Sequence, residues 1–450
     1  MTASVAVLGT APSGLMDALE SRRSTSLRVT RSCGSVEEIL GACQAGIAQV
    51  ALFLEGAELL DVTTVDRLRA LGVLVVVCHG DPEERARLSG VGAVALPLEA
   101  GIERLEAVAA GTGQAIVPSS VQESQDSVPW PEAGPVDEAP GSRGFPDEGE
   151  SGRGGKAVDD AAVDSVPRLL AVWGPAGAPG RTMVAVNLAA ELALGGRRVL
   201  LMDLDTYGAS IAASLGLLDE SAGIALACRQ ADLGRFDVAA LARIAVSVQL
   251  PSATFDVLSG ITRAERWSEL RAAALERVLR LCGTVYDHLV IDTGFCLEGE
   301  EEALYEATAP RRNEAALCAL AHADRVYAVA DSGPVGVPRL VRSLPRLMEV
   351  APTADWVVLM NKVRKETSGR SPERQLREAW ERFGPDIPIR GFLPFNPAIA
   401  DSALREGTVL AESAPNSELR NALRAQLCAP AQRSRRSSVF YTTTRWLRSR

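Results

Sequence analysis

A glycine-rich stretch between an apolar run and an amphipathic run constrains this chain more than any other feature. Residues 169–189 read LLAVWGPAGAPGRTMVAVNLA. In a strand, glycine-rich loop and helix of this kind, backbone N–H groups and the helix N-terminus bind phosphate. The stretch therefore predicts a phosphate-binding loop in a domain of alternating strands and helices.

The loop departs from the pattern G-x-x-x-x-G-K-[S/T] at two positions. Pro175 stands at the first glycine, and Arg181 stands at the lysine. The chain has only three lysines, none of them near residue 180 in the sequence. Gly177, Gly180, Arg181 and Thr182 can still supply the turns, one cation and a hydroxyl group for magnesium. We therefore expect phosphate binding to be retained in an altered form.

Polar residues end three of the later apolar runs. Asp203 and Asp205 end VLLMDLD, Asp292 ends LVID, and Asn361 lies at the end of VVLMN. Carboxylates at one sheet edge are typical of a magnesium–nucleotide site, and an amide can pair with a purine edge. The alternative is that each aspartate only caps the next turn or helix.

Six long apolar runs predict a doubly wound α/β domain over residues 166–428. The runs are LLAVWG (169–174), RRVLLMDLD (197–205), FDVLSG (255–260), DHLVIDTG (287–294), RVYAVAD (325–331) and DWVVLMNK (355–362). Continuous apolar runs are typical of parallel strands that are buried on both faces. Ligands of such sheets bind at the carboxyl ends of the strands.

Residues 1–112 predict a smaller parallel sheet of five strands. The runs are SVAVLG (4–9), SLRVTRS (26–32), AQVALFLEG (48–56), VLVVVCH (73–79) and AVALPLE (93–99), and helical patterns separate them. Parallel strands need crossover helices, so this is a (βα)5 pattern. Ser35 and the pair Asp81-Pro82 are expected helix starts.

This first part resembles a response-regulator receiver domain in outline but lacks the phosphorylation site. GTAPSG follows the first strand, where receivers carry an acidic pair. Leu54 and Glu55 stand at the phospho-acceptor aspartate, and Leu96 replaces the lysine before Pro97. Glu55 is open to two interpretations, a fixed phospho-mimic or a solvated loop residue. We interpret the part as a pseudo-receiver that serves docking or dimerisation.

Two further segments have distinctive compositions. Residues 113–165 are rich in Pro, Gly, Ser and acids, which predicts a disordered acidic linker. Residues 429–450 are basic and contain Phe440, Tyr441 and Trp446. Such a tail suits an anionic membrane surface or nucleic acid, and the alternative is a solvated end.

The remaining totals exclude several classes. Hydrophobic residues make up 47% and charged residues 23%, as in soluble globular proteins, and the net charge of -10 argues against a body that coats nucleic acid. No stretch approaches the about 18–20 apolar residues of a membrane span, and the N-terminus lacks the pattern of a secretory signal. The eight cysteines form no CxxC pair and there are three histidines, so we expect no zinc site and reduced cysteines in a cytoplasmic protein.

The loop and the strand ends together resemble the ParA/MinD ATPases with a deviant Walker A loop. The matching motifs are GAPGRT, VLLMDLDTYG, VIDTGF, LMNK and the closing segment LPFNPAIADSALREGTVL. The resemblance covers roughly residues 167–415. It is closest to the CpaE/TadZ-like branch, which includes actinobacterial septum-site-determining homologues and whose members carry a receiver-like N-terminal domain.

The resemblance implies roles for residues that match the family's motifs. Asp205 would orient the attacking water, and Asn361 would contact adenine. The loop would hold ATP, and oxygen ligands would hold Mg²⁺. The implied nucleotide-binding residues are Gly177, Gly180, Arg181, Thr182, Met183 and Asn361, and the implied metal ligands are Thr182, Asp203 and Asp292.

The same resemblance exposes departures in the loop. The family's loop reads K-G-G-x-G-K-[S/T] and begins here at Ala176, so the lysine that reaches across a dimer is absent. Arg181 replaces the second lysine, and Pro179 has no N–H group. Arginine is a planar fork rather than a compact ammonium group. We expect ATP binding with weak or no hydrolysis.

The predicted function is spatial regulation of septum placement or of pilus or secretion machinery, through a nucleotide-dependent homodimer and protein partners. A peripheral contact of the basic tail with the inner face of the membrane is a further expectation, and nucleic acid is a less favoured partner. One alternative is a non-enzymatic pseudo-ATPase scaffold that positions partners. A second is a chromosome-partitioning ATPase.

Overall fold

The computed structural model describes residues 2–9, 26–112, 167–217, 221–299, 311–368 and 370–427. Three features of the sequence lie outside the described residues: the helical pattern SGLMDALESRR (13–23) between the first two apolar runs, the 113–165 linker and the 429–450 tail. In the described ranges, no helix has the combined length and apolar character needed to cross a bilayer.

The N-terminal part forms the predicted parallel sheet of five strands. The strand order is β2-β1-β3-β4-β5, and every neighbouring pair is parallel. This is the 2-1-3-4-5 order of flavodoxin-like folds, as expected of a receiver-like domain. The strands are β1 (Ala3–Leu8), β2 (Leu27–Cys33), β3 (Val50–Phe53), β4 (Leu74–His79) and β5 (Val94–Pro97). The helices are α2 (Val36–Gln44), α3 (Val62–Ala70), α4 (Pro82–Gly90) and α5 (Ile102–Thr112), with a short 3₁₀ turn η1 (Ala57–Leu59).

Both expected helix starts of this part are confirmed. The Ser35 hydroxyl accepts a hydrogen bond from the N–H of Glu38 at the start of α2. The Asp81 carboxylate accepts from the N–H of Glu83, with Pro82 in the first turn of α4. These side chains satisfy N–H groups that have no partner inside the helix.

The residues at the position of a receiver's phospho-acceptor are not aspartates. Leu54 follows β3 and is buried, and Glu55 is exposed in the next turn. Leu96, at the position of the receiver lysine, is also buried. The described residues at the carboxyl end of this sheet therefore provide neither the aspartate nor the cation of a phosphorylation site.

We expect no phosphate transfer from acetyl phosphate or a histidine kinase to residues 1–112, because an acyl phosphate needs an aspartate at the end of β3. Mass spectrometry of the treated protein measures this. A single phosphorylated residue mapped to residues 1–112 would overturn the expectation.

The second part forms a sheet of eight strands in the order β13-β12-β11-β6-β10-β7-β9-β8. All neighbouring pairs are parallel except β8 with β9. The strands are β6 (Leu169–Trp173), β7 (Val199–Leu204), β8 (Val246–Gln249), β9 (Thr254–Leu258), β10 (His288–Thr293), β11 (Arg325–Asp331), β12 (Asp355–Val363) and β13 (Ile389–Pro394). All six predicted strands are present, and the two edge strands β8 and β13 are additional.

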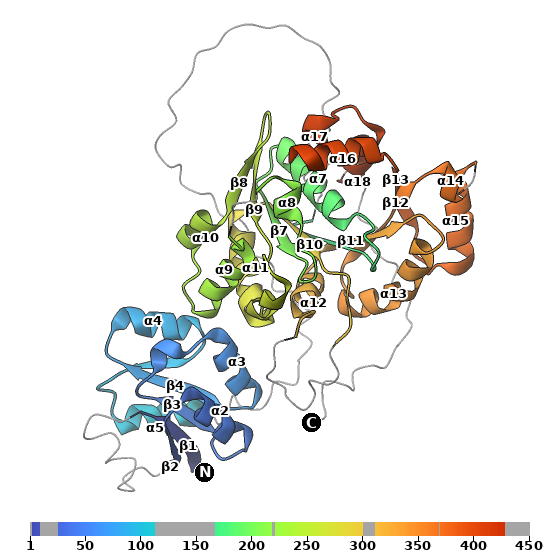
Figure 1. The fold of residues 1–450 in the computed structure, drawn as a ribbon. Helices are drawn as coiled ribbons and strands as arrows, with labels where there is room; N and C mark the ends of the chain where they lie inside the picture. The colour runs from blue at the N-terminus through green and yellow to red at the C-terminus, as the bar shows by residue number, and fades with distance from the viewer. Residues whose placement is uncertain are drawn as a thin grey trace, which may run out of the picture.

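Helices cover both faces of this sheet (Figure 1). Helices α7, α17 and α18 pack on one face around Val184, Leu410 and Leu423, and α9, α11, α12 and α13 pack on the other around Leu279 and Leu340. Both faces of the central strands are therefore buried, which explains their continuous apolar runs. The helices on the first face are α7 (Arg181–Leu194), α8 (Ile211–Ser214), α16 (Pro397–Glu406), α17 (Leu410–Ser413) and α18 (Glu418–Leu427). The others are α9 (Gly223–Asp232), α10 (Val238–Ile244), α11 (Ala272–Val285), α12 (Glu314–Ala321), α13 (Gly336–Val350), α14 (Lys365–Ser368) and α15 (Pro372–Phe383), with a 3₁₀ turn η2 (Ala264–Glu269).

The N-terminal part contacts the larger part through α3 and α4, which lie beside α9 and α11 (Figure 1). The N–H and hydroxyl groups of Thr63 donate to Asp232 Oδ1 at 3.0 and 2.7 Å. Arg87 donates to the carbonyl of Leu233 at 2.9 Å, and Arg277 donates to the carbonyl of Gly90 at 2.6 Å. These polar contacts attach the small sheet to helices that cover one face of the large sheet.

Candidate functional site

The glycine-rich loop connects β6 to α7 in an unusual backbone conformation. Gly177, Ala178 and Gly180 have positive φ angles of 111°, 51° and 98°. Gly177 and Ala178 are consecutive and Pro179 separates them from Gly180, so the loop mixes left-handed and ordinary residues, as anion-binding turns do. Gly180 is also the N-cap of α7, so the N-terminus of this helix opens on the same loop. A turn with positive φ angles therefore leads into a helix N-terminus, which is the arrangement expected of a phosphate loop.

Two consecutive residues of β12 hold the outer side of the loop. Asn361 Nδ2 donates to the carbonyl of Pro179 at 2.7 Å, and Lys362 Nζ donates to the carbonyl of Ala178 at 2.8 Å. A Cβ on Gly180 would lie 2.3 Å from Asn361 Nδ2, so only glycine leaves room for this contact. Asn361 Oδ1 accepts from the N–H of Lys362. Asn361 thus supports the loop, and its contact with adenine stays a prediction.

Arg181, which replaces the second lysine, pairs with a strand-end carboxylate. Its Nη2 lies 2.8 Å from Asp205 Oδ2, and its Nη1 donates to the carbonyl of Gly174 at 3.1 Å. The side chains of Arg181 and Asp205 are only 13% and 8% exposed, so solvent screens the pair weakly. Asp205 Oδ1 accepts from the N–H groups of Tyr207 and Gly208. The positive charge at the start of α7 is therefore engaged with Asp205.

Thr182 and Asp292 form the part of the site best suited to a cation. Thr182 Oγ1 donates to Asp292 Oδ2 at 2.5 Å and lies 2.9 Å from Ser210 Oγ. Asp292 is fully buried, and its Oδ1 has no hydrogen-bond partner among the described residues. Burial, followed by the nearby Asp203 carboxylate, raises the pKa of Asp292 well above its ordinary value. A hydroxyl and an unpartnered carboxylate oxygen are the hard ligands that Mg²⁺ prefers, so these residues fit that ion.

Asp203 lies beside Asp292 in the register of β7 and β10, but its carboxylate has different hydrogen-bond partners. Its Oδ2 accepts from the N–H groups of Ser210 and Ile211 at 2.9 and 3.0 Å, and its Oδ1 accepts from that of Asp205. Burial raises the pKa of Asp203 to about 6, and these backbone hydrogen bonds oppose the rise. These contacts cap the turn after β7 and the start of α8. A role of Asp203 as a metal ligand stays a prediction.

The structure brings the predicted residues together in pairs: Arg181 with Asp205, Thr182 with Asp292, and Gly180 with Asn361. Met183 lies in the first turn of α7 and packs partly against the core. Two contributors were missed by the sequence reasoning. Lys362 had a signal, since it follows Asn361 directly in LMNK, whereas Ser210 had none.

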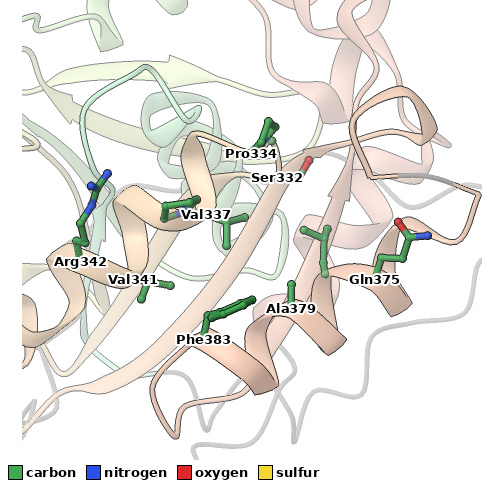
Figure 2. Close-up of a pocket in the computed structure, with 11 residues that line it drawn as sticks. Ser332, Pro334, Val337, Val341, Arg342, Gln375, Ala379 and Phe383 are labelled. Atoms are coloured by element: carbon green, nitrogen blue, oxygen red, sulfur yellow. The ribbon is translucent and has the colours of Figure 1, made fainter.

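The domain also has an apolar groove away from the loop. A pocket of about 510 Å³ between α13 and α15 is lined mainly by apolar side chains, including Val337, Leu376 and Phe383. Figure 2 shows Phe383 and Ala379 of α15 facing Val337 and Val341 of α13. Its lining includes neither a loop residue nor a strand-end carboxylate. The phosphate site expected at the loop is therefore distinct from this groove.

A separate cluster of potential metal ligands lies on α11 and α12. One ligand atom each of Glu276, Cys318 and His322 lies within 4.8 Å of the other two. Cys318 is buried and the other two are exposed. The seven cysteines among the described residues are all free thiols. The cluster shares no residue with the loop, and the expected absence of a zinc site stays a prediction.

The comparison with known families agrees with the geometry of the loop. The model of the CobQ/CobB/MinD/ParA nucleotide binding domain matches residues 170–409, which is more than half of the chain. The chain therefore belongs to this family, and the expected ParA/MinD membership is confirmed. The match begins in β6 and includes the loop and every strand-end residue discussed above.

Similar proteins are more distant or match only in part. An iron-sulfur cluster carrier protein of Deinococcus radiodurans is 44% identical over 61 residues, 14% of this chain and 17% of that protein. The chain thus spans less than a fifth of this relative's length. A ParA family ATPase of Chlorobium tepidum is similar at 16% identity, covering 58% of this chain and 98% of that one, with a TM-score of 0.46. The septum site-determining protein MinD of Pyrococcus horikoshii, solved with Mg-ADP, is similar at 19% identity, covering 58% and 94%, with a TM-score of 0.44.

Proposed function

We propose that the chain binds ATP with Mg²⁺ at the loop between β6 and α7 and hydrolyses it slowly. The observation that carries this proposal is the hydrogen bond between half-buried Thr182 and buried Asp292, which keeps one carboxylate oxygen without a partner among the described residues. The pair lies at the N-terminus of a helix preceded by a turn with positive φ angles. The proposed nucleotide-binding residues are Gly177, Gly180, Arg181, Thr182, Met183 and Asn361.

Each part of the site has a proposed task. The loop N–H groups and the N-terminus of α7 hold the phosphates, and Thr182 and Asp292 hold the metal, with Asp203 as a further candidate ligand. When bound, Mg²⁺ supplies positive charge beside the terminal phosphate oxygens. Asp205 orients the attacking water once Arg181 has turned from the carboxylate to the phosphate.

Slow hydrolysis is expected because the cations of the loop are reduced. Ala176 offers no charge, and Arg181 is held by Asp205 at 2.8 Å. Pro179 has no N–H group, so one donor of the loop is missing. Phosphoryl transfer depends almost entirely on positioning and electrostatic stabilisation, and both are weakened here.

We further propose that nucleotide binding drives formation of a homodimer that positions septum, pilus or secretion machinery, as in the CpaE/TadZ-like branch. The receiver-like sheet docked beside α9 and α11 supports this assignment, since it provides a second surface for partners. In this proposal the chain has a pseudo-receiver domain (residues 1–112), an acidic linker (113–165), a ParA/MinD-like domain (166–428) and a basic tail (429–450). The protein is cytoplasmic, and the tail makes peripheral contact with anionic lipid.

Light scattering measures the proposed association directly. We expect the full chain to have the mass of a monomer without nucleotide or with ADP, and of a dimer with Mg²⁺ and a non-hydrolysable ATP analogue. ADP provides the matched control because it lacks only the terminal phosphate. A mass that is the same in all three states would contradict nucleotide-driven dimerisation.

A pseudo-ATPase scaffold is the second candidate function. The ion pair between Arg181 and Asp205 favours it, because this pair satisfies both groups without a nucleotide. In that case the two domains act as interaction surfaces and the loop is a structural turn. A chromosome-partitioning ATPase is less favoured because the net charge is -10.

A further inference from the structure

A row of arginines on α13 reaches the start of the phosphate loop. Arg339, Arg342 and Arg346 are spaced by three and four residues, which places them on one side of the helix. Arg339 Nη1 donates to the carbonyl of Ala176 at 3.0 Å. A Cβ on Gly177 would lie 2.4 Å from the same nitrogen, so the guanidinium group lies directly against the loop.

The three arginines line a pocket of about 370 Å³ beside the loop. Pro175 and Ala176 form one wall, and residues 295–298, which follow β10, form another. The pocket therefore opens between the start of the phosphate loop and the segment after Asp292. Arg342 also lines the apolar groove between α13 and α15, where Figure 2 shows it on α13 at the end away from Gln375, so this side chain lies between the two pockets.

The first two arginines of the row differ from the third in their partners. Arg346 donates to the carbonyl of Leu297 and pairs with the carboxylate of Glu349 at 2.9 Å. Within the ranges that the structure describes, no carboxylate forms an ion pair with Arg339 or Arg342. Both are exposed, and the side chain of Arg339 donates to a neutral carbonyl, that of Ala176. Two guanidinium groups thus remain available to an anion at the edge of the loop.

We propose that Arg339 and Arg342 bind the distal phosphate of a nucleoside triphosphate held in the loop. The inference rests on the proposed nucleotide binding. A phosphate oxygen is a stronger acceptor for a guanidinium group than a carbonyl is, and it can be bound bidentately. Arg339 would exchange the Ala176 carbonyl for this phosphate and supply a cation where position 176 has none. A diphosphate lacks the recognised group, so the pair would distinguish ATP from ADP.

Equilibrium titration of the full chain with Mg-ATP, Mg-ADP and inorganic phosphate tests the proposal. We expect the variant carrying both Arg339→Gln and Arg342→Gln to bind ATP about tenfold more weakly, a loss of about 1.4 kcal/mol, and ADP within twofold of the wild type. Arg374→Gln is the matched control, because it removes the same charge from an exposed arginine on α15 that does not line the pocket, and it should leave both affinities unchanged. The conservative Arg339→Lys should retain part of the preference for ATP.

The outcomes separate this inference from the proposed function. Equal losses for ATP and ADP, or no loss in the double variant, would overturn the inference and leave nucleotide binding intact. Binding of inorganic phosphate alone that the double variant loses would identify a site for a free oxyanion and overturn the assignment to the nucleotide. Failure of the wild type to bind either nucleotide would overturn both. Circular dichroism verifies that each exposed substitution leaves the fold intact.

Discussion

Combining Ala176→Lys with Arg181→Lys is expected to raise the rate of ATP hydrolysis at least tenfold. The first substitution adds a cation at the start of the loop. The second replaces a fork that contacts Gly174 and Asp205 with a compact ammonium group. Cations supplied to a transferring phosphate contribute about 10³–10⁵-fold in related chemistry, which sets the upper bound. Release of labelled phosphate under single-turnover conditions measures the rate.

The single variants and one added substitution control this result. Each lysine alone should raise the rate less than the pair, because the two act on the same phosphates. Adding Asp205→Asn to the double variant should return the rate to its starting value and so exclude a contaminating ATPase. An unchanged rate with intact ATP binding would instead assign the defect to the loop backbone at Pro179.

Thr182→Ala is expected to weaken magnesium-dependent ATP binding at least tenfold. The substitution removes the hydroxyl that contacts Asp292 and leaves that buried carboxylate without its described side-chain donor. Losing a metal ligand and a buried hydrogen bond together corresponds to more than about 1.4 kcal/mol. Titration with ATP at fixed Mg²⁺, repeated with EDTA, separates the metal-dependent part of binding.

Two variants accompany this measurement. Thr284→Ala removes a threonine hydroxyl that only bonds the carbonyl of Leu281 on α11, so ATP binding should not change. Asp205→Ala should also preserve binding, because Asp205 contacts Arg181 and the following turn and not Thr182. Equal affinities for wild type and Thr182→Ala would contradict the assigned metal site.

The central part of the fold was predictable because parallel strands that are buried on both faces have continuous apolar sequences. Continuous apolar runs predicted β6, β7 and β9–β12, and all six are present. The edge strands β8 and β13 were missed for a physical reason. Each alternates between more and less buried residues, and β13 also contains Gly391 and Pro394, so neither forms a continuous apolar run.

The candidate site was predictable in its membership but not in its pairings. Parallel strands place their carboxyl ends together, so Asp203 and Asp292 were expected at one edge, and they are neighbours in the register. No local pattern shows that Arg181 forms an ion pair with Asp205. The contacts of Lys362 and Arg339 with the loop join residues more than 160 positions apart, and only the folded chain brings them together.

The two neighbouring strand-end aspartates differ in their hydrogen-bond partners. At Asp203, three backbone N–H groups occupy the carboxylate, whereas Asp292 keeps one oxygen without a partner among the described residues. The two alternatives that the sequence left open, capping and metal binding, thus have different support at neighbouring positions. Side-chain hydrogen bonds at the end of a strand depend on the following turn, which periodicity does not reveal.

Equilibrium binding of ATP to the full chain, with and without Mg²⁺, tests whether the loop between β6 and α7 is a nucleotide site. We expect saturable ATP binding in the presence of Mg²⁺ that is at least tenfold weaker in EDTA, because Thr182 and Asp292 require the ion to face the phosphates. Absence of binding up to about 1 mM ATP in both conditions would contradict this expectation and would leave the loop as a structural turn closed by Arg181 and Asp205.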